Sequence, residues 1–285
     1  MLKWSVGDVT ITRVLEFELP VAYSEKRPFV VEARPEALRE MPWLYDHFVT
    51  ADGHLMLAVQ ALLIDAPGLR LIVDTCVGND KPRRMTGKTA LQTNFLELLG
   101  AAGCPPESVQ AVVCTHLHVD HVGWNTRLQD GKWVPTFPNA RYLLGRAEYE
   151  HFVGWDDAEK GAILADSIQP IFDAGLVELV EMNHRLSAEV RLIPTPGHTP
   201  GHVSVMIESR GQQALITGDV MHHPCQIGRP SWTTLLDGDR EAAGSTRRSL
   251  LDSVADQPVL LIGTHFATPT AGHVKRDGVG FRFEV

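Results

Sequence analysis

Four side chains that could bind a metal ion fall within six positions of one short segment. His116, His118, Asp120 and His121 follow directly after an apolar run that predicts a buried strand. Imidazole nitrogens and carboxylate oxygens are donors that borderline divalent metals select. His116 and His118 are two positions apart, so in an extended segment they point the same way, and the next two ligands follow as the chain turns. One loop could therefore supply ligands to two adjacent metal ions.

Three later apolar runs each end in small residues followed by a side chain of the ligand type. The first precedes a turn rich in proline and glycine that contains His198 and His202. The second run ends just before Asp219, and the third ends just before His265. A metal site along one edge of a sheet sandwich would require this repeated order of strand and ligand.

Together these motifs resemble those of the metallo-β-lactamase superfamily of hydrolases. The matching elements are Val-Asp-Thr at 73–75, His-x-His-x-Asp-His at 116–121, Pro-Gly-His at 196–198, Gly-Asp at 218–219 and Gly-Thr-His at 263–265. The resemblance implies an α/β fold, a four-layer αββα sandwich with a dinuclear site at one edge of its two sheets. We expect residues 1–285 to form a single such domain. Residues 20–54 would be an irregular N-terminal insertion that either covers the pocket or forms a dimer arm.

Carried onto this sequence, the resemblance assigns seven ligands to two metal ions. They form a first set, a second set and a bridging carboxylate: His116, His118 and His198; Asp120, His121 and His265; and Asp219. His202 would brace its turn, and Asp74 would orient one of the ligand histidines. We expect two divalent ions with Zn²⁺ as the first choice, although Mn, Co and Fe are compatible with the same donors.

The chemistry implied by two metals that share a carboxylate is hydrolysis. Such a pair can hold one hydroxide between its members and polarise a substrate oxygen, and zinc lowers the pKa of bound water to about 7. Asp120 would orient the hydroxide and pass its proton to the leaving group. We therefore predict a metal-dependent hydrolase that uses a bridging hydroxide to open a lactone, such as an acyl homoserine lactone, or to cleave a related carboxylic ester.

Other functions fit the same metal-binding pattern. An organophosphate triesterase or arylesterase of the methyl-parathion-hydrolase kind needs the same hydroxide and polarised oxygen, and it is the main alternative. Less favoured are a β-lactamase, a thioesterase, a mononuclear iron oxygenase and a non-catalytic metal-stabilised protein. His118 argues against the iron branch, and only about twenty residues follow His265, too few for the glutathione-binding domain of the related thioesterases. A count of bound metals would separate the hydrolase from the oxygenase.

Residues beside the ligand loops predict where substrate is bound. His222 stands three positions after Asp219, where acyl homoserine lactonases carry a tyrosine that helps to polarise the substrate carbonyl. An imidazole could donate a hydrogen bond there or act as an acid, so we expect His222 to be catalytic. We expect Trp124, His222, His223 and Phe266 to contact substrate. Apolar and aromatic linings favour an apolar or aromatic small molecule.

Composition limits the partners and the location. A formal net charge of −9 without a Lys/Arg cluster argues against a nucleic acid partner. The sequence contains neither a signal-peptide pattern nor an apolar run long enough to span a membrane, so we expect no membrane partner. Four scattered cysteines suit a reducing compartment, and we expect a cytoplasmic protein that could be a homodimer.

Periodicity and turn residues predict the elements that position these motifs. We expect strands over 8–15, 57–65, 69–74, 109–114, 141–144, 190–193, 203–207, 214–216 and 259–262, and an edge strand or hairpin over 272–285. We expect helices over 36–40, 91–99, 147–151, 158–172 and 239–254. The last helix would be capped by Asp237 or Asp239, because an aspartate oxygen can accept from a free N–H of the first turn.

Overall fold

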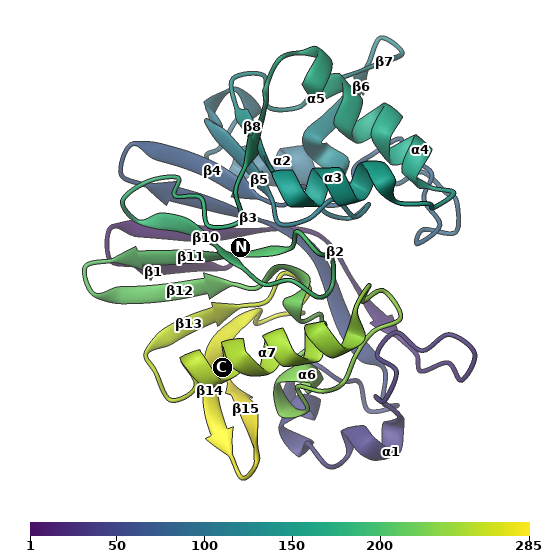
Figure 1. Ribbon diagram of the computed structural model, residues 1–285, viewed down its shortest axis with the longest axis vertical. Helices are drawn as coiled ribbons and strands as arrows, with labels where there is room; N and C mark the ends of the chain where they lie inside the picture. The colour runs from purple at the N-terminus through teal and green to yellow at the C-terminus, as the bar shows by residue number, and fades with distance from the viewer.

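Two β-sheets stacked between layers of helices form the fold of the computed structural model, which describes residues 1–285 (Figure 1). The seven strands of the first sheet are, in spatial order, β1 (Lys3–Val6), β2 (Val9–Val21), β3 (Leu55–Ala66), β4 (Leu69–Val73), β5 (Ala111–Cys114), β8 (Arg141–Gly145) and β9 (Val177–Val180). Neighbouring strands from β1 to β4 are antiparallel, and those from β4 to β9 are parallel. Parallel strands need crossover connections, and these carry most helices of this half.

The second sheet comes from the C-terminal part of the chain. Its six strands are, in spatial order, β10 (Val190–Pro194), β11 (Val203–Ser209), β12 (Gln212–Ile216), β13 (Val259–Ile262), β14 (Ala271–Asp277) and β15 (Gly280–Glu284). Only the β12–β13 pair is parallel. A separate hairpin, β6 (Thr126–Gln129) and β7 (Lys132–Pro135), lies outside both sheets.

The core is divided into three apolar clusters that separate the four layers. Ile64 and Val113 of the first sheet pack against Val205 and Ile216 of the second. The outer face of the first sheet is covered by α2 (Phe95–Ala101), α3 (Arg146–Gly154), α4 (Lys160–Ile163), the π-helical turn η4 (Leu164–Ile168) and α5 (Gln169–Asp173). The outer face of the second is covered by α6 (Cys225–Gly228) and α7 (Arg240–Val254). The predicted αββα sandwich is confirmed.

The irregular segment over residues 20–54 packs into the second half of the molecule. It contains α1 (Pro35–Leu38) and the 3₁₀ turn η1 (Pro42–Asp46). Leu38 and Phe48 are buried in the same apolar cluster as α6 and α7. The backbone N–H of Val31 donates to the carbonyl of Thr233 at 2.8 Å, which joins the segment to the loop before α7.

The hairpin over 57–74, the terminal hairpin and most other predicted strands are present, but several predicted boundaries are wrong. The chain begins with a strand, β1, that the sequence pattern did not indicate, and the β6–β7 hairpin was also missed. The helix predicted from residue 91 starts at Phe95, because Asn79 accepts a hydrogen bond from the backbone N–H of Thr93 at 2.7 Å and holds that segment as a loop. The helix predicted over 158–172 is divided into α4, η4 and α5. Pro170 lacks the N–H that a continuous helix requires there.

No helix has the length and apolar character needed to cross a membrane. All four cysteines are buried and free.

Candidate metal centre

The end of strand β5 places the first ligand loop at the edge of the sandwich. The loop is attached to the end of β4 by Asp74, whose carboxylate accepts from the backbone N–H of Thr115 at 2.8 Å and from its hydroxyl at 2.9 Å. The backbone N–H of Thr75 donates to the carbonyl of His121 at 2.8 Å. These bonds fix both ends of the loop, so its side chains are held before any ligand arrives.

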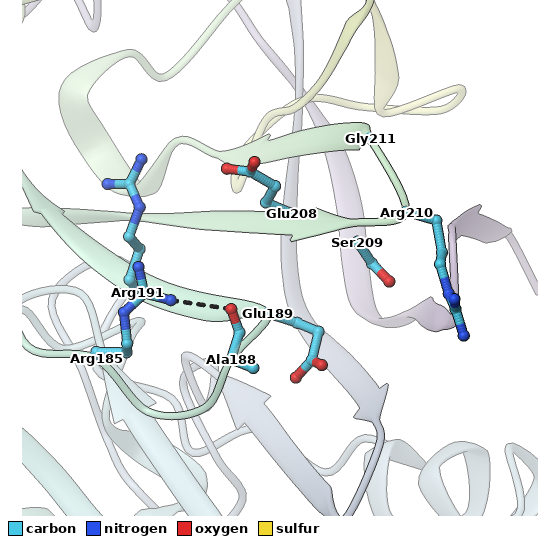
Figure 2. A pocket seen from close by; sticks show the side chains of 8 residues that line it. All are labelled: Arg185, Ala188, Glu189, Arg191, Glu208, Ser209, Arg210 and Gly211. Atoms are coloured by element: carbon cyan, nitrogen blue, oxygen red, sulfur yellow. Dashed lines mark hydrogen bonds between the residues drawn. The ribbon is translucent and has the colours of Figure 1, made fainter.

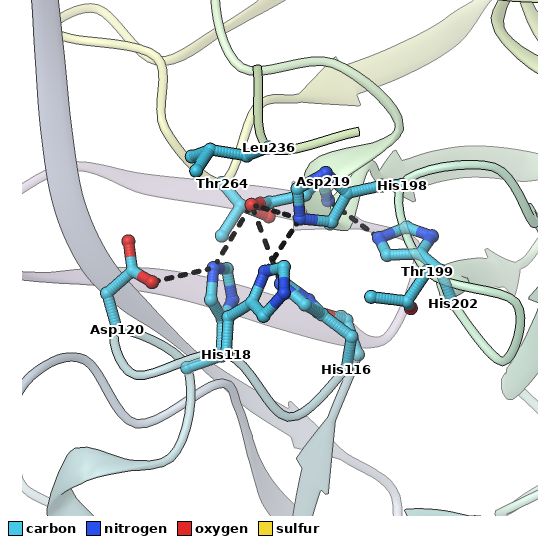
Figure 3. Close-up of polar contacts among 12 residues, drawn as sticks. His116, His118, Asp120, His198, Thr199, His202, Asp219, Leu236 and Thr264 are labelled. Atoms are coloured by element: carbon cyan, nitrogen blue, oxygen red, sulfur yellow. Dashed lines mark hydrogen bonds and ion pairs between the residues drawn. The ribbon is translucent and has the colours of Figure 1, made fainter. Parts of the chain in front are cut away.

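Three imidazoles converge to form the first donor group. The ring nitrogens of His116, His118 and His198 lie within 4.8 Å of one another. The Nε2 of His198 is 2.9 Å from the Nδ1 of His118. Figure 3 shows these side chains pointing toward one another and toward Asp219, from loops that are far apart in the sequence. The structure therefore brings together the residues predicted for a first metal ion.

A second donor group lies beside the first. Asp120, His121 and His265 each present a donor atom within 4.8 Å of the other two. The two Nε2 atoms of His121 and His265 are 3.2 Å apart, and the Nε2 of His265 is 3.6 Å from Oδ2 of Asp120. These are the residues predicted for a second metal ion.

The carboxylate of Asp219 stands between the two groups. Its Oδ2 is 3.6 Å from Nε2 of His116 and 3.5 Å from Nε2 of His198. Its Oδ1 is 3.1 Å from Nε2 of His265. Oδ2 also lies 3.3 Å from Nε2 of His121, so the carboxylate is within reach of both groups, as is expected of a bridging ligand.

Two of these donor atoms form no hydrogen bond within the protein. Nε2 of His116 and Oδ1 of Asp219 are buried and form no hydrogen bond. Leaving buried polar atoms unpaired costs stability, so such atoms mark a place where another group binds. Nitrogen and oxygen donors at this density suit divalent ions of the zinc type. The side chains present therefore fit a pair of metal ions.

Burial and the neighbouring carboxylates together determine how the imidazoles titrate. Burial holds the pKa values of His116 and His118 well below the usual range, so both rings are neutral and able to coordinate. Burial would also lower the pKa of His265, but Asp219 and Asp120 outweigh it and raise that pKa to about 9. Burial opposes ionisation of Asp219, yet the surrounding imidazoles hold its pKa well below the usual range. The centre therefore favours cations.

Each ring except His118 has a partner on the nitrogen that faces away from the centre. Asp74 lies 2.9 Å from Nδ1 of His121, as predicted. For His265 the partner is the carbonyl of Ala58, 2.8 Å from Nδ1. Such contacts fix the orientation of a ligand ring and leave Nε2 free for the metal.

Asp237 is a further partner of this kind, and the sequence pattern did not identify it. Its Oδ1 is 3.0 Å from Nδ1 of His198, and its Oδ2 accepts from the backbone N–H of Thr234 at 2.9 Å. Burial would raise the pKa of Asp237, but the hydrogen bonds with His198 and Thr234 and the nearby imidazoles together outweigh it and lower that pKa to about 2. The cap of α7 is Asp239 instead, whose side chain accepts from Ala242. No local spacing could have indicated that a residue near a predicted helix cap reaches a ligand 39 positions earlier.

His202 braces its turn, as predicted. Its Nδ1 is 2.8 Å from Oγ1 of Thr195, and its Nε2 accepts from the backbone N–H of Asp219 at 2.7 Å. Gly218 makes this contact possible, because its φ is +55° and a Cβ there would stand 2.5 Å from the His202 ring. His202 therefore positions Asp219 and has no free nitrogen for a metal.

His222 reaches the centre from the loop after β12. Its Nε2 is 3.2 Å from Oδ2 of Asp219, and its ring stacks on His265 with centroids 5.8 Å apart. The ring of Phe29 lies edge-on at 5.6 Å. Burial lowers the pKa of His222, and its Nδ1 has no hydrogen-bond partner. A buried imidazole next to the carboxylate of Asp219 therefore faces the centre.

Trp124 does not line the site, contrary to expectation. Its ring is buried and stacks on Phe95 with centroids 5.3 Å apart. Its Nε1 donates to Glu16 at 2.7 Å. The 3₁₀ turn η3 (Gly123–Asn125) directs the side chain into the core beneath the ligand loop, so Trp124 supports the fold and is closed to substrate.

His223 and Phe266 are also corrected. Nε2 of His223 is 2.8 Å from the carbonyl of Phe48, and its Nδ1 accepts from the N–H of Cys225, so both nitrogens are used internally. Phe266 is fully buried between Phe48 and Phe283. Side chains next to a ligand in sequence point away from it when the chain turns, and both residues belong to the core.

One aromatic residue contacts the first group. The ring of Trp155, after α3, lies 5.6 Å from that of His118. Leu236, in the loop before α7, is 54% exposed and is drawn in the close-up of the centre (Figure 3).

A surface pocket of about 310 Å³ lies elsewhere in the second sheet (Figure 2). It is lined by charged residues at the ends of β10 and β11 that are remote from the ligand turn, including Arg191 and Glu208. Nη1 of Arg185 donates to the carbonyl of Ala188 at 2.9 Å within it. None of the converging histidines lines this pocket, so it has no part in the metal centre.

The family model of the Metallo-beta-lactamase superfamily matches residues 56–265. The chain belongs to this superfamily. The resemblance inferred from the ligand motifs is therefore confirmed, and the match extends from β3 to the last of the seven predicted ligands, His265.

Individual members of the superfamily are similar over part or all of the chain. An N-acyl homoserine lactonase of a Bacillus species is 29% identical over 136 residues, which cover 47% of this chain and 48% of that protein. The N-acyl homoserine lactonase AttM of Rhizobium radiobacter is 30% identical over 125 residues, 42% of this chain and 44% of AttM. The matched region spans about half the length of these relatives.

Two solved structures share the whole fold. AidC, a dizinc quorum-quenching lactonase, superposes with a TM-score of 0.79 at 21% identity, covering 99% of this chain and 96% of AidC. The hydrolase AbOPH superposes with a TM-score of 0.80 at 23% identity, covering 99% of this chain and 95% of AbOPH. At this identity the likeness establishes a common architecture.

Proposed function

We propose that this chain is a dinuclear metal-dependent hydrolase that opens a lactone, such as an acyl homoserine lactone, or cleaves a related carboxylic ester. The observation that carries the proposal is the position of Asp219, whose carboxylate lies within 3.6 Å of imidazoles from both donor groups. Further support comes from the solved structures of AidC and of an N-acyl homoserine lactone hydrolase, each with an acyl homoserine product bound.

The seven predicted ligands would hold the two ions in the sets given by the motifs. His116, His118 and His198 would bind one ion, Asp120, His121 and His265 the other, and Asp219 both. Zn²⁺ is the proposed metal, because neutral imidazoles and carboxylates are its ordinary ligands. Such a metal pair supplies a nucleophilic water at neutral pH and polarises the substrate oxygen.

Asp120 is proposed to move the proton. Its carboxylate is half-buried, whereas His121 and His265 of the same group are buried, so it lies at the open side of the second group. There it can accept the proton of the attacking water while the new bond to the carbonyl carbon forms. It can return that proton to the ring oxygen as the ester C–O bond breaks, which is general acid–base catalysis.

His222 is proposed to bind the substrate oxygen. The ring is buried beside Asp219, its pKa is lowered, and its Nδ1 lacks a hydrogen-bond partner. A neutral imidazole in that state can donate one N–H to a carbonyl oxygen as negative charge develops on it. The ring stands where the related lactonases use a tyrosine, so the same function would be served by different chemistry.

The apolar surroundings suggest what else the substrate carries. Phe29 touches His222, Trp155 touches His118, and Leu236, which is drawn in the close-up of the centre, is exposed. We propose that these side chains receive an apolar or aromatic part of the substrate. Phe29 belongs to the 20–54 segment, so that segment would act as a pocket cover. If the segment also forms a dimer arm, a measurement of molecular size in solution will show a homodimer.

An organophosphate triester remains the alternative substrate, because the same ligands and the same polarised oxygen would serve it. A panel of purified-protein assays tests the ranking, with acyl homoserine lactones of several chain lengths, aryl esters and a phosphotriester. We expect the highest kcat/KM for a lactone with an apolar acyl chain. If the phosphotriester gave the highest kcat/KM, the ranking would be reversed. If none of these compounds were hydrolysed, the proposed function would be refuted.

We also propose a cytoplasmic location, which the four free cysteines favour.

A further inference from the structure

The carboxylate of Glu148 lies between the two loops that supply the first donor group. Glu148 belongs to the first turn of α3 and is only 2% exposed. Its Oε1 accepts from the backbone N–H of Leu117 at 3.1 Å, and its Oε2 accepts from the hydroxyl of Thr199 at 2.6 Å. Leu117 separates His116 from His118, and Thr199 follows His198. One side chain thus connects the segments that carry all three imidazoles.

The start of α3 packs directly against the loop that carries His198, so the backbone position of Glu148 is fixed. A Cβ at Gly201 would stand 2.2 Å from the backbone nitrogen of Glu148 and 2.4 Å from its Cα. Only glycine permits this approach, and the distance from the helix backbone to that loop is therefore set by direct contact.

Apolar packing alone does not account for a carboxylate at this position. Burying a carboxylate is costly unless hydrogen bonds compensate, and no arginine or lysine pairs with Glu148. A leucine or methionine would fill a similar volume without that cost. Its two carboxylate oxygens each accept a hydrogen bond from a different ligand loop, and these two bonds keep the side chain buried.

We propose that Glu148 is a positioning residue that sets the spacing between the His116–His118 segment and His198, and hence the affinity of the first metal ion. The inference rests on the dinuclear centre proposed above. It applies to one site only, because the rings of His121 and His265 are oriented by Asp74 and Ala58, which Glu148 does not touch.

The test is a zinc titration of the full-length protein in competition with a chromophoric chelator, which resolves two binding constants per chain. His198→Ala and His265→Ala first identify which constant belongs to which site. Glu148→Ala removes both acceptors. Glu148→Gln keeps them in modified form, since its Oε1 can accept from Leu117 while its Nε2 donates to the Thr199 hydroxyl.

We expect Glu148→Ala to weaken zinc at the His198-dependent site by about tenfold or more, the scale for partners that orient ligands. The His265-dependent constant should stay within about twofold, and Glu148→Gln should restore the first to near the native value. Thr199→Val, which removes one hydroxyl arm, should weaken the same site by a smaller factor. If Glu148→Ala does not fold, the zinc affinity of Thr199→Val at this site tests the proposal by itself.

A matched control is Glu16→Ala. Glu16 is another buried carboxylate, and it accepts from the backbone N–H groups of Val77 and Gly78 at 2.8 and 3.1 Å. Its loss should lower the melting temperature of the metal-free protein without a selective effect on the first site. The proposal is overturned if Glu148→Ala leaves the first constant unchanged, weakens both sites equally, or acts no differently from Glu16→Ala. A native protein that binds fewer than two zinc ions would contradict the dinuclear function instead, whichever result the variants give.

Discussion

The Nδ1–H of His198 donates to Asp237 over 3.0 Å, and this contact connects the ring of a predicted metal ligand to the segment before helix α7. Asp237 is held in turn by the backbone of Thr234 and lies 3.8 Å from the buried guanidinium of Arg247. Arg247 also donates to the carbonyls of Val220 and Pro230 at 2.7 Å. The orientation of one ligand is thereby fixed by a polar network that crosses three segments of the second half.

Asp237→Ala should therefore weaken metal at the first site. Loss of the carboxylate frees the His198 ring to rotate and removes the preference for the Nδ1–H tautomer, which ordinarily costs about 10- to 100-fold in metal affinity. Chelator competition measures the change. Asp239→Ala is the control, because Asp239 only caps α7 and its loss should cost about 1 kcal/mol of stability without affecting metal. Equal metal loss in both variants would show that the effect is one of folding.

Asp120→Asn should abolish most of the hydrolysis while the fold persists. The amide cannot accept the proton of the attacking water, and general acid–base catalysis contributes about 10²- to 10⁴-fold in rate. Steady-state assays on the best lactone measure kcat, and circular dichroism verifies the fold. Asp130→Asn, in the exposed turn between β6 and β7, is the matched control. Full activity in Asp120→Asn would exclude the proposed proton transfer.

His222→Phe separates two functions of a ring that is 3.2 Å from the bridging carboxylate. If His222 donates to the substrate oxygen, the variant keeps two metal ions and loses about 10² in kcat, the usual effect of one such donor. His222→Gln should recover part of that loss. If the variant instead loses one metal ion, His222 is a ligand, because His198, Asp219 and His222 also present donors within 4.8 Å of one another.

Lys81 predicts a pH dependence of stability that is independent of the metal centre. Its ammonium is fully buried, lies 3.8 Å from the centroid of the Trp133 ring and donates to the carbonyl of Thr126 at 3.0 Å. Burial lowers the pKa of Lys81 to about 7. The unfolded chain keeps the ordinary value of about 10.4, so between these values it binds a proton that the folded state does not. Stability must therefore rise with pH through that window.

The measurement is urea unfolding of the metal-free protein between about pH 7 and pH 9.5, for the native chain and for Lys81→Met. The free energy of unfolding of the native chain should gain on that of the variant by up to about 1.4 kcal/mol per pH unit. Lys132→Met, at an exposed position beside Trp133, should track the native chain. A difference between native and Lys81→Met that does not change with pH would mean that Lys81 stays charged when folded.

The convergence of the seven predicted donor residues could be foreseen from sequence because each is attached to a local signal. An apolar strand that stops at His116, Asp219 or His265 is visible in a few consecutive residues, and strand ends meet at a sheet edge. The resemblance to the superfamily predicted the αββα layers and the bracing contacts of His202 and Asp74. The patterns that succeeded were short and depended on backbone direction alone.

The supporting and substrate-facing residues could not be predicted in that way. Glu148 and Asp237 act across 31 and 39 positions, and nothing near them in sequence distinguishes them from surface acids. Trp124 and Phe266 were misassigned because proximity to a ligand in sequence does not fix which way a side chain points after a turn. Phe29 was missed because its contact with His222 depends on how an irregular segment folds back on the core.

The most direct test of the central claim is an activity titration of the metal-free protein with Zn²⁺, following the opening of an acyl homoserine lactone. A dinuclear centre bridged by Asp219 predicts little activity at one equivalent and a plateau at two equivalents per chain. Full activity with one ion, or activity that needs a single iron and no second metal, would contradict the account.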